Sequence, residues 1–389
     1  MKPIITVLLV GNMVLAILAA TGDTRDVLPP KHVEDFSMFN ARWPELGQTW
    51  LEINGQICGA MPDERGPIGG GAGYTDFIPP PADPVTTLDG LLEALGEARA
   101  GDVVYIDGNA EIDCTVRVYI EDLVIEIPEG ATLASNREQG DSRGGMIFSD
   151  TFKTRPLIRV AGPNVRITGL RIRGPNPRPH LEHHRRSFAE GRGHEYYYKF
   201  PTSDGIVTDY PGLEVDNCEL GGWSHAAINL RAGDKHHIHH NFIHHNQYNG
   251  LGYGVCHNKA FSLIEYNLFN YNRHSIAGTG RSASGYEARH NVEIKHSLSH
   301  CFDMHGGRDR KDGTNTAGTW IKVHHNTFRS SRQAIVIRGV PEQDAEIYNN
   351  WFYQKPGDTS VRSAGNTRIT NNAYGLTDTE FLDHAEPEP

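Results

Sequence analysis

The sequence has little of what several common classes of protein require. Its 389 residues carry 37 Lys and Arg against 48 Asp and Glu, a net charge of −11, so the chain as a whole lacks the basic footprint of a nucleic-acid-binding protein. The five cysteines include no Cys-x-x-Cys pair and are too few for a disulfide scaffold, so most should be small buried residues. Long amphipathic helical patterns are scarce, and the zinc motif H-E-x-x-H is absent. What remains is a glycine-rich chain with 38% hydrophobic residues, enough for one large all-β solenoid.

The two ends of the chain differ from the rest. Residues 1–20 place one lysine before an apolar run that ends in Leu-Ala-Ala, which predicts a secretory signal peptide cleaved near Ala19 or Ala20. We therefore expect a secreted protein, extracellular or periplasmic, with no membrane contact after cleavage, and we expect a monomer. Residues 21–85 are rich in proline and glycine and predict an extended arm, while residues 377–389 predict a flexible tail.

A repeat of about 24 residues runs through the second half of the chain. Each copy reads apolar, x, x, Asn or Cys, and the copies begin at positions 215, 238, 264, 288, 323 and 347. A second short β-rich string follows each copy, as in HAAINLR (225–231) and QAIVIRG (333–339). Coils of this length with an asparagine at one turn are typical of a parallel β-helix. The turn asparagines should bond to one another along the solenoid: Asn241, Asn267, Asn291, Asn326 and Asn350.

With these repeats the chain resembles the right-handed parallel β-helix proteins of the pectate-lyase-like superfamily, over roughly residues 100 to 375. The resemblance implies an all-β solenoid, here residues 86–376, whose coils each run through three sheets. It also implies that a catalytic site lies on the first sheet and on the turn before it. Residues 86–102 carry four leucines at helical spacing behind Thr87, which predicts an N-terminal helix capping the open end of the solenoid.

The alternation of side chains along strands predicts which residues of the first sheet share a face. The row expected to point inward is Ala227, Leu251, Ile276, Phe302 and Ile335. The first row expected to point outward is Ile228, Gly252, Ala277, Asp303 and Val336. The second outward row, two residues further along each strand, is Leu230, Gly254, Thr279, His305 and Arg338. The turn before the sheet would hold His225, Asn249, His274, His300 and Gln333. Because successive coils lie about 4.8 Å apart, His274 and His300 should be neighbours, with Asp303, His305 and Arg338 beside them.

The histidine-rich stretch HHIHHNFIHHN (236–246) falls outside this predicted cluster. Its register places His239 on the outside of the second sheet, in a row with Glu265 and Arg289. We expect a solvated face with ordinary surface ion pairs rather than a metal site, and we assign no metal ligands. Calcium could enter only through Asp303, since such a site needs several oxygen ligands and the acids here do not cluster.

Two inserts interrupt the repeat and should border the predicted groove. Residues 175–204 carry arginines, histidines and three consecutive tyrosines, and residues 306–318 account for the one coil of 35 residues. Cations with aromatic rings on an acidic protein favour an anionic polysaccharide as the ligand, bound by Arg185, Arg186 and Tyr197. The alternative is a solvated insert whose arginines pair with its own glutamates.

The composition of the predicted cluster favours β-elimination from a uronic acid over hydrolysis. Asp209 and Asp303 are four coils apart, about 19 Å, which is too far for a glycosidase pair. Elimination needs a base, an acid and a cation that neutralises the carboxylate. We predict a polysaccharide lyase without a firmly implied cofactor, in which His274 or His300 is the base and Asp303 orients His305 or binds calcium. The remaining roles are carboxylate binding by Arg338 and His305 and substrate binding by Asn249, Tyr248, Arg273 and His225.

Three other functions remain open from the sequence. A uronate C5-epimerase would use nearly the same residues, a glycoside hydrolase would need a further loop acid, and a non-catalytic glycan-binding or structural module would use the solenoid only as a rigid surface.

Overall fold

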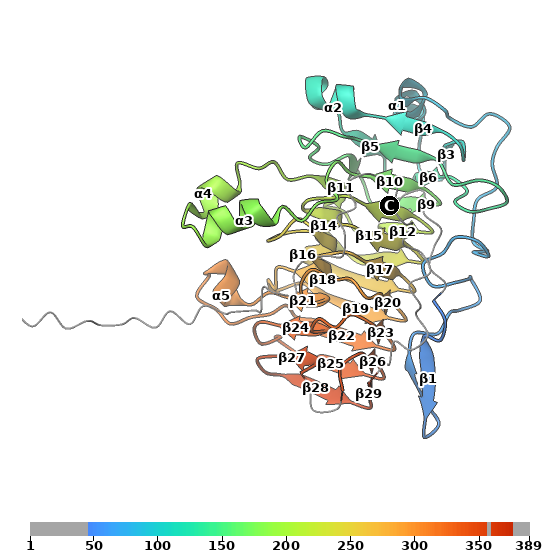
Figure 1. Ribbon diagram of the computed structural model, residues 1–389. Coiled ribbons are helices and arrows are strands. Elements are labelled where there is room, and N and C mark those ends of the chain that lie inside the picture. Colours follow the sequence, from blue (N-terminus) through green and yellow to red (C-terminus); the bar gives the residue numbers. More distant parts are fainter. Residues whose placement is uncertain (1–45, 356–358, 376–389) are drawn as a thin grey trace, which may run out of the picture. The chain divides into compact units, whose positions relative to one another are not determined.

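The computed structural model describes residues 46–355 and 359–375, which form a right-handed parallel β-helix (Figure 1). The predicted signal peptide, the first part of the predicted arm and the predicted tail lie outside these residues. Coils follow one another in chain order from the helix-capped end to β29. Among the described residues, no helix is long and apolar enough to span a membrane.

Each complete coil contributes a strand to each of three faces. The first face comprises β5 (Ile125–Ile127), β8 (Ile158–Val160), β11 (Asp204–Thr208), the start of β14 (Ala226–His239), the start of β16 (Tyr253–Glu265), β18 (His274–Gly278), β21 (Phe302–Met304), β24 (Ile335–Ile337) and β27 (Val361–Arg362). The second comprises β3 (Val103–Tyr105), β6 (Thr132–Ala134), β9 (Arg166–Thr168), β12 (Glu214–Asp216), the ends of β14 and β16, β19 (Gly285–Arg289), β22 (Trp320–His324), β25 (Ala345–Tyr348) and β28 (Thr367–Thr370). The third comprises β4 (Glu111–Asp113), β7 (Met146–Phe148), β10 (Arg171–Arg173), β13 (Glu219–Gly221), β15 (Phe242–His244), β17 (Leu268–Asn270), β20 (Val292–Glu293), β23 (Thr327–Phe328), β26 (Trp351–Phe352) and β29 (Ala373–Tyr374).

The interior of the solenoid is a column of stacked apolar side chains. On the first face Ile206, Ile228, Val255 and Ile276 pair in successive coils, followed by Phe302 and Ile335, and all six are fully buried. All five cysteines lie in the described residues and are buried and unpaired, as their number predicted. Stacking identical positions at one strand spacing buries each apolar side chain against its counterparts in the coils above and below.

The predicted asparagine ladder is present between the second and third faces. The amides of Asn241, Asn267, Asn291, Asn326 and Asn350 bond in sequence, with side-chain distances of 2.9–3.0 Å, and Asn372 extends the ladder by one coil. The left-handed backbone conformation falls not on the ladder asparagines but on the residues directly before them, which include His240, Tyr266 and His290. The ladder asparagines are therefore required for their buried amide hydrogen bonds, which satisfy turn backbone groups that water does not reach.

The predicted helix is α1 (Leu88–Glu97). The Thr87 side chain accepts a hydrogen bond from Gly90 N, and Leu91 and Leu95 are buried against the first coils. It ends at Glu97, within the segment 86–102 that predicted it. A second helix, α2 (Thr115–Glu121), follows in the next part of the chain.

The two inserts contain short helices rather than irregular loops. Residues 175–204 form α3 (Leu181–Phe188) and α4 (Gly193–Tyr197), which project beside β11 and β14, and residues 306–318 contain α5 (Gly307–Arg310) (Figure 1).

Residues 46–85 run along the solenoid and cover part of the second and third faces. They contain one hairpin, β1 (Trp50–Ile53) and β2 (Gln56–Gly59), and Tyr74 donates to the buried carboxylate of Asp216 at 2.9 Å. Gly70 has φ 68°, and a Cβ there would meet His240 O at 2.3 Å, so only glycine lets the arm lie this close to the turn. The arm decides which second-face side chains reach solvent.

Candidate functional site

The register of the first face matches the prediction from β18 onward. Ile276, Phe302 and Ile335 pair and point inward, so Asp303 and Arg338 point outward as expected. The prediction for the two preceding coils was wrong. Ile228 and Leu230 are the inward residues of β14, and Val255 and His257, not Leu251 and Tyr253, are their partners in β16. The turn over residues 246–252 contains two glycines with positive φ and delays the strand by four residues, which the alignment of apolar letters could not reveal.

Asp303 is the centre of the cluster that this register assembles. Its two oxygens accept from Arg338 Nε at 3.1 Å and from an Arg338 terminal nitrogen at 2.6 Å. His300 Nε2 lies 2.9 Å from one oxygen and His305 Nε2 lies 3.0 Å from the other. Burial opposes ionisation of Asp303, but the contacts with His300 and His305 hold the pKa of its carboxyl well below its usual range. The four residues therefore form one buried carboxylate surrounded by three cationic or polarisable groups.

His274 lies beneath His300. The two ring centroids are 3.9 Å apart, and His274 Nδ1 donates to the backbone carbonyl of His300 at 2.6 Å. Burial and the neighbouring Arg273 lower the pKa of His274 well below its ordinary value, so its imidazole is neutral at neutral pH. His274 is fully buried, whereas the His300 side chain is 14% exposed, so a ligand would reach His300 first.

Arg273 and Tyr253 lie beside this pair. The Tyr253 ring stacks on His274 at 5.9 Å and meets the edge of His225 at 5.7 Å, and the Arg273 guanidinium lies 5.9 Å from the Tyr253 centroid. Arg273 has no carboxylate partner among the residues that the structure describes. Burial raises the pKa of Tyr253 to about 12, so its hydroxyl stays protonated. Tyr253 was missed from the sequence, because the misaligned register hid its place at the start of β16.

His225 is oriented by an acid of the preceding coil. His225 Nδ1 lies 2.6 Å from an Asp204 oxygen, and Asn229 donates to the same oxygen at 3.3 Å. Burial works against the charged imidazole, but the Asp204 carboxylate outweighs it and raises the pKa of His225. This second acid–histidine pair lies toward the inserted helices α3 and α4.

The predicted ligand contacts of the 175–204 insert take other roles. Tyr197 and Tyr248 are buried in an aromatic cluster with His183, and the Tyr197 hydroxyl donates to Asn249 O at 2.9 Å. Asn249 therefore anchors the insert instead of occupying the turn position beside His274. Sugar contact by these tyrosines was expected, but they are buried between the insert and the turn over residues 246–252, which prevents it.

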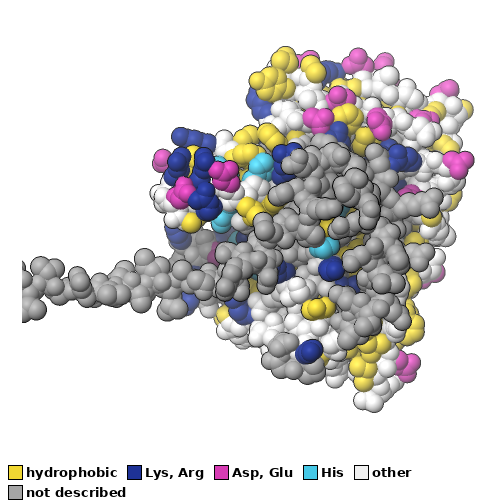
Figure 2. All heavy atoms as spheres, viewed as in Figure 1, with side chains coloured by type: hydrophobic (Ala, Val, Ile, Leu, Met, Phe, Trp, Pro, Cys, Tyr) yellow, Lys and Arg dark blue, Asp and Glu magenta, His cyan; other side chains and the backbone are white. Residues whose placement is uncertain are grey.

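The insert arginines pair with their own glutamates. Arg185 binds Glu190, and Arg186 binds Glu182 at 2.6 Å with the spacing of one helical turn. Figure 2 shows dark blue and magenta side chains mixed over this part of the surface. The alternative of a solvated insert, raised from the sequence, describes these two arginines.

The histidine-rich stretch is not a solvated face, and that prediction was wrong. His236, His239, His240 and His244 are almost fully buried, and only His237 is substantially exposed. The row itself is as predicted, since His239 pairs with Glu265 and Glu265 with Arg289. Glu265 is not an ordinary surface partner, because it also accepts from Arg65 of the arm at 2.9 Å and from His237 at 2.8 Å. The arm over residues 46–85 removes this face from water, which the strand register alone cannot show.

Two groups among the described residues have the donors to hold a metal ion. They are His274, His300 and Asp303 on the first face and Glu214, His237 and His239 on the second, each with donor atoms within 4.8 Å of one another. In the first group Arg338 already occupies both Asp303 oxygens and Arg273 adds a second positive charge nearby. That group is suited to handling protons rather than a cation.

Comparison with known proteins finds only distant structural neighbours. No family model matches the chain, and no curated protein matches it by sequence. Among solved structures, an alginate lyase from Paenibacillus is similar at 12% identity and a TM-score of 0.35, over 75% of this chain and 96% of the lyase. The A-module of a mannuronan C-5 epimerase from Azotobacter vinelandii is similar at 12% identity and a TM-score of 0.40, over 73% and 71% of the two chains. The Dettilon tailspike protein is similar at 11% identity and a TM-score of 0.39, over 74% and 64%.

Proposed function

We propose that the protein is a lyase that cleaves a uronate-containing polysaccharide by β-elimination at the Asp303 cluster. The observation that carries this proposal is the Asp303–His300 contact beside an arginine, Arg273, that has no carboxylate partner among the described residues. Base and cation are the two parts that elimination from a uronic acid requires on one side of the sugar ring.

His300 is the base in this proposal. Its Nε2 faces the Asp303 carboxylate at 2.9 Å, which favours the tautomer with a proton on Nε2 and a lone pair on Nδ1. Burial, opposed by Asp303, lowers the pKa of His300, so the imidazole is unprotonated and able to accept a proton at neutral pH. His274 fixes the backbone and the ring of His300 from beneath and is a positioning residue.

Arg273 takes the role that the sequence assigned to Arg338. Three of the five Arg338 N–H groups are directed at Asp303 and Asp309, so this guanidinium is mostly neutralised. Arg273 would pair with the substrate carboxylate and stabilise the negative charge that develops there when C5 loses its proton.

The elimination is completed by a proton donor to the leaving oxygen. His300 Nδ1 takes the C5 proton, the electron pair forms the C4–C5 double bond, and the C4–O bond breaks. His305, whose side chain is 25% exposed and lies 3.0 Å from Asp303, supplies the proton to the departing oxygen.

Hydrolysis has less support from this site. A glycosidase needs a carboxylic acid with a raised pKa to protonate the leaving oxygen. Asp303 has the opposite property, because its contacts keep it ionised.

The test is to incubate the full chain with uronate polysaccharides of different composition and to follow the ultraviolet absorbance of the C4–C5 double bond. We expect a rise with at least one polysaccharide, abolished by His300→Gln and unaffected by His324→Gln, a histidine of the second face. Proton exchange at C5 without a double bond would replace the lyase with an epimerase. Shortening of the chain without a double bond would replace it with a hydrolase, and no chemistry at all would leave a binding module.

A further inference from the structure

The described residues contain three copies of one side-chain arrangement. In each, a histidine at the end of a strand bonds through Nδ1 to the Nδ1 of the following histidine and through Nε2 to a glutamate of the preceding part of the solenoid. We call this arrangement the Glu–His–His unit. The three units are Glu214–His239–His240, Glu219–His244–His245 and Glu287–His324–His325.

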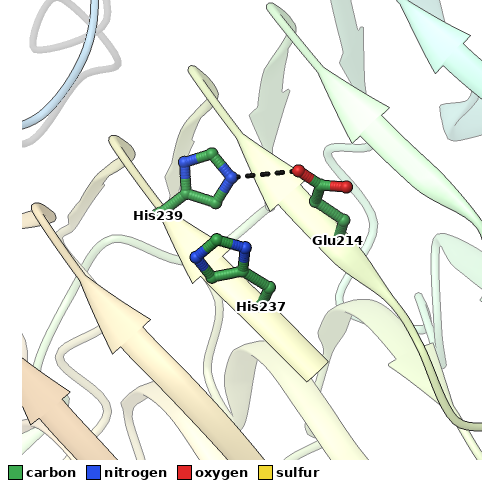
Figure 3. Close-up of side chains that lie close together, drawn as sticks. All are labelled: Glu214, His237 and His239. Atoms are coloured by element: carbon green, nitrogen blue, oxygen red, sulfur yellow. Dashed lines mark hydrogen bonds and ion pairs between the residues drawn. The ribbon is translucent and has the colours of Figure 1, made fainter. Parts of the chain in front are cut away.

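The units differ at the position directly opposite the glutamate in the next strand. The strand register places His237 opposite Glu214, Phe242 opposite Glu219 and Lys322 opposite Glu287. The His237 ring lies 4.0 Å from that of His239, and the Phe242 ring lies 4.1 Å from that of His244, so the geometry is the same. Only the first unit therefore adds a third ligand, and Figure 3 shows both of its imidazoles turned toward the Glu214 carboxylate.

The first unit is also short of one proton. The chain Asp63–His240–His239–Glu214 contains three contacts of 3.0–3.1 Å, each of which needs a proton between its two atoms. Two neutral imidazoles carry only two N–H protons. A third positive species is needed, as an additional proton or as a metal ion between His239 and Glu214.

The other two units have no such deficit. In one, the amide of Asn349 donates to His325 Nε2, so the two neutral imidazoles need to donate only to one another and to Glu287. In the other, His245 Nε2 has no hydrogen-bond partner among the described residues, and two protons again suffice. The proton deficit and the third histidine thus coincide at the first unit alone.

We propose that Glu214, His237 and His239 bind a divalent transition-metal ion of the zinc class. The separation between His239 Nε2 and the Glu214 oxygen is 3.1 Å, and all three donor atoms lie within 4.8 Å of one another. Two donors at about 2.1 Å from a tetrahedral zinc ion are about 3.4 Å apart, so small side-chain rotations complete the site. The His237 and Glu214 side chains are 30% and 36% exposed, which leaves an approach for the ion and room for water as a further ligand.

The remaining contacts of both histidines are those of metal ligands. His237 donates Nε2–H to Glu265 at 2.8 Å, which leaves the lone pair of Nδ1 for the ion. With the ion on Nε2, His239 donates Nδ1–H to His240, and His240 donates to Asp63 at 3.1 Å. Carboxylates that hold the second nitrogen of a ligating histidine fix its orientation and raise its basicity.

The proposed ion would connect three parts of the chain. It joins β12 to β14, and through His240 and Asp63 it is coupled to the arm over residues 46–85. This role is structural and is independent of the function proposed for the Asp303 cluster.

The decisive variant is His237→Lys, because Lys322 occupies the same position in the third unit and the fold accommodates it. The full chain is stripped with EDTA, dialysed against Zn²⁺ and analysed for bound metal, with Co²⁺ absorption as a second readout of the ligand set. We expect His237→Lys to lose one equivalent of Zn²⁺ and the tetrahedral Co²⁺ spectrum. Asp63→Asn, which leaves all three ligands in place, should weaken Zn²⁺ binding about 10–100-fold.

The matched control is His324→Ala, which breaks a Glu–His–His unit that has no third ligand. It should bind as many equivalents as the wild type. Equal binding by the wild type and His237→Lys would overturn the proposal, as would an equal loss in His324→Ala. Circular dichroism of each variant separates a lost site from a lost fold.

Discussion

Asp303→Asn tests the proposed catalytic cluster and its electrostatics together, because the amide keeps the shape of the carboxylate but removes its charge. Asp303 is fully buried and contacts Arg338 twice, His300 once and His305 once. Removing one partner of a buried ion pair costs about 3–5 kcal/mol. In Asp303→Asn, Arg338 keeps its contact with Asp309 and remains partly exposed to water. We therefore expect a loss of unfolding free energy at the lower end of this range, about 3 kcal/mol, and a fall in Tm of about 3–6 °C.

The difference in stability between the wild type and Asp303→Asn should shrink as the pH falls. The folded-state pKa of Asp303 is depressed below its unfolded value, so its stabilisation is fully present above about pH 4 and is lost as the pH falls toward the folded-state pKa. Thermal melts of the wild type and Asp303→Asn should therefore differ at neutral pH and converge in acid.

Asp303→Asn should also change turnover, because Asp303 influences the pKa of His300, the proposed base. The wild-type kcat/KM should lose activity only below the ordinary histidine pKa of about 6.5, because burial lowers the pKa of His300. Asp303 opposes that lowering of the His300 pKa, so in Asp303→Asn the acid limb of the kcat/KM profile should move to still lower pH. The kcat/KM of the variant on the plateau of the profile should be reduced about 10²–10⁴-fold. Double-bond absorbance measured across pH reports both effects.

The matched control is Asp309→Asn, which removes the more exposed carboxylate partner of Arg338 and does not touch His300. It should change stability by no more than about 1 kcal/mol and leave the pH profile in place. The reasoning fails if Asp303→Asn keeps wild-type turnover and an unshifted acid limb, or if its stability deficit persists unchanged into acid.

Two further predictions concern Arg273 and the asparagine ladder. Arg273→Gln should lower kcat/KM about 10–100-fold by removing a charge-assisted contact with the substrate carboxylate, while Arg185→Gln, in an arginine already paired within the insert, should leave kinetics on the same polysaccharide unchanged. Asn291→Ala breaks four buried hydrogen bonds in the middle of the ladder and should destabilise the chain by about 3 kcal/mol, whereas Asn372→Ala, at the end, should cost less. Denaturant unfolding of both variants would contradict the ladder argument if their losses were equal.

The cluster around Asp303 could be predicted from the sequence because its coils are regular. From β18 to β24 the apolar residues Ile276, Phe302 and Ile335 are true partners, as the alignment assumed. Alternation alone therefore places Asp303 and Arg338 outward and His274 beside His300. The prediction failed by one residue in β14 and by four in β16, where a turn with two glycines of positive φ precedes the strand. A spacing of apolar letters does not record how many residues a turn uses.

The roles of the aromatic and basic insert could not be read from composition. Tyr197 and Tyr248 have the chemistry to stack on sugars, but they pack on one another at 5.3 Å where the insert meets the turn over residues 246–252. Burial of this kind depends on how a segment folds back, and composition gives no information about it.

The sequence by itself determined the solenoid, the asparagine ladder and the gathering of imidazoles around Asp303, because a parallel β-helix converts sequence period directly into spatial stacking. Only the tertiary structure decided that Arg338 is mostly neutralised, that Arg273 is available and that the histidine-rich stretch is buried. The burial of that stretch depends on contacts between segments with no periodic relation, such as Asp63 of the arm with His240. A strand repeat fixes the neighbours along the solenoid, whereas a covering arm packs across it through side-chain and backbone contacts that follow no repeat.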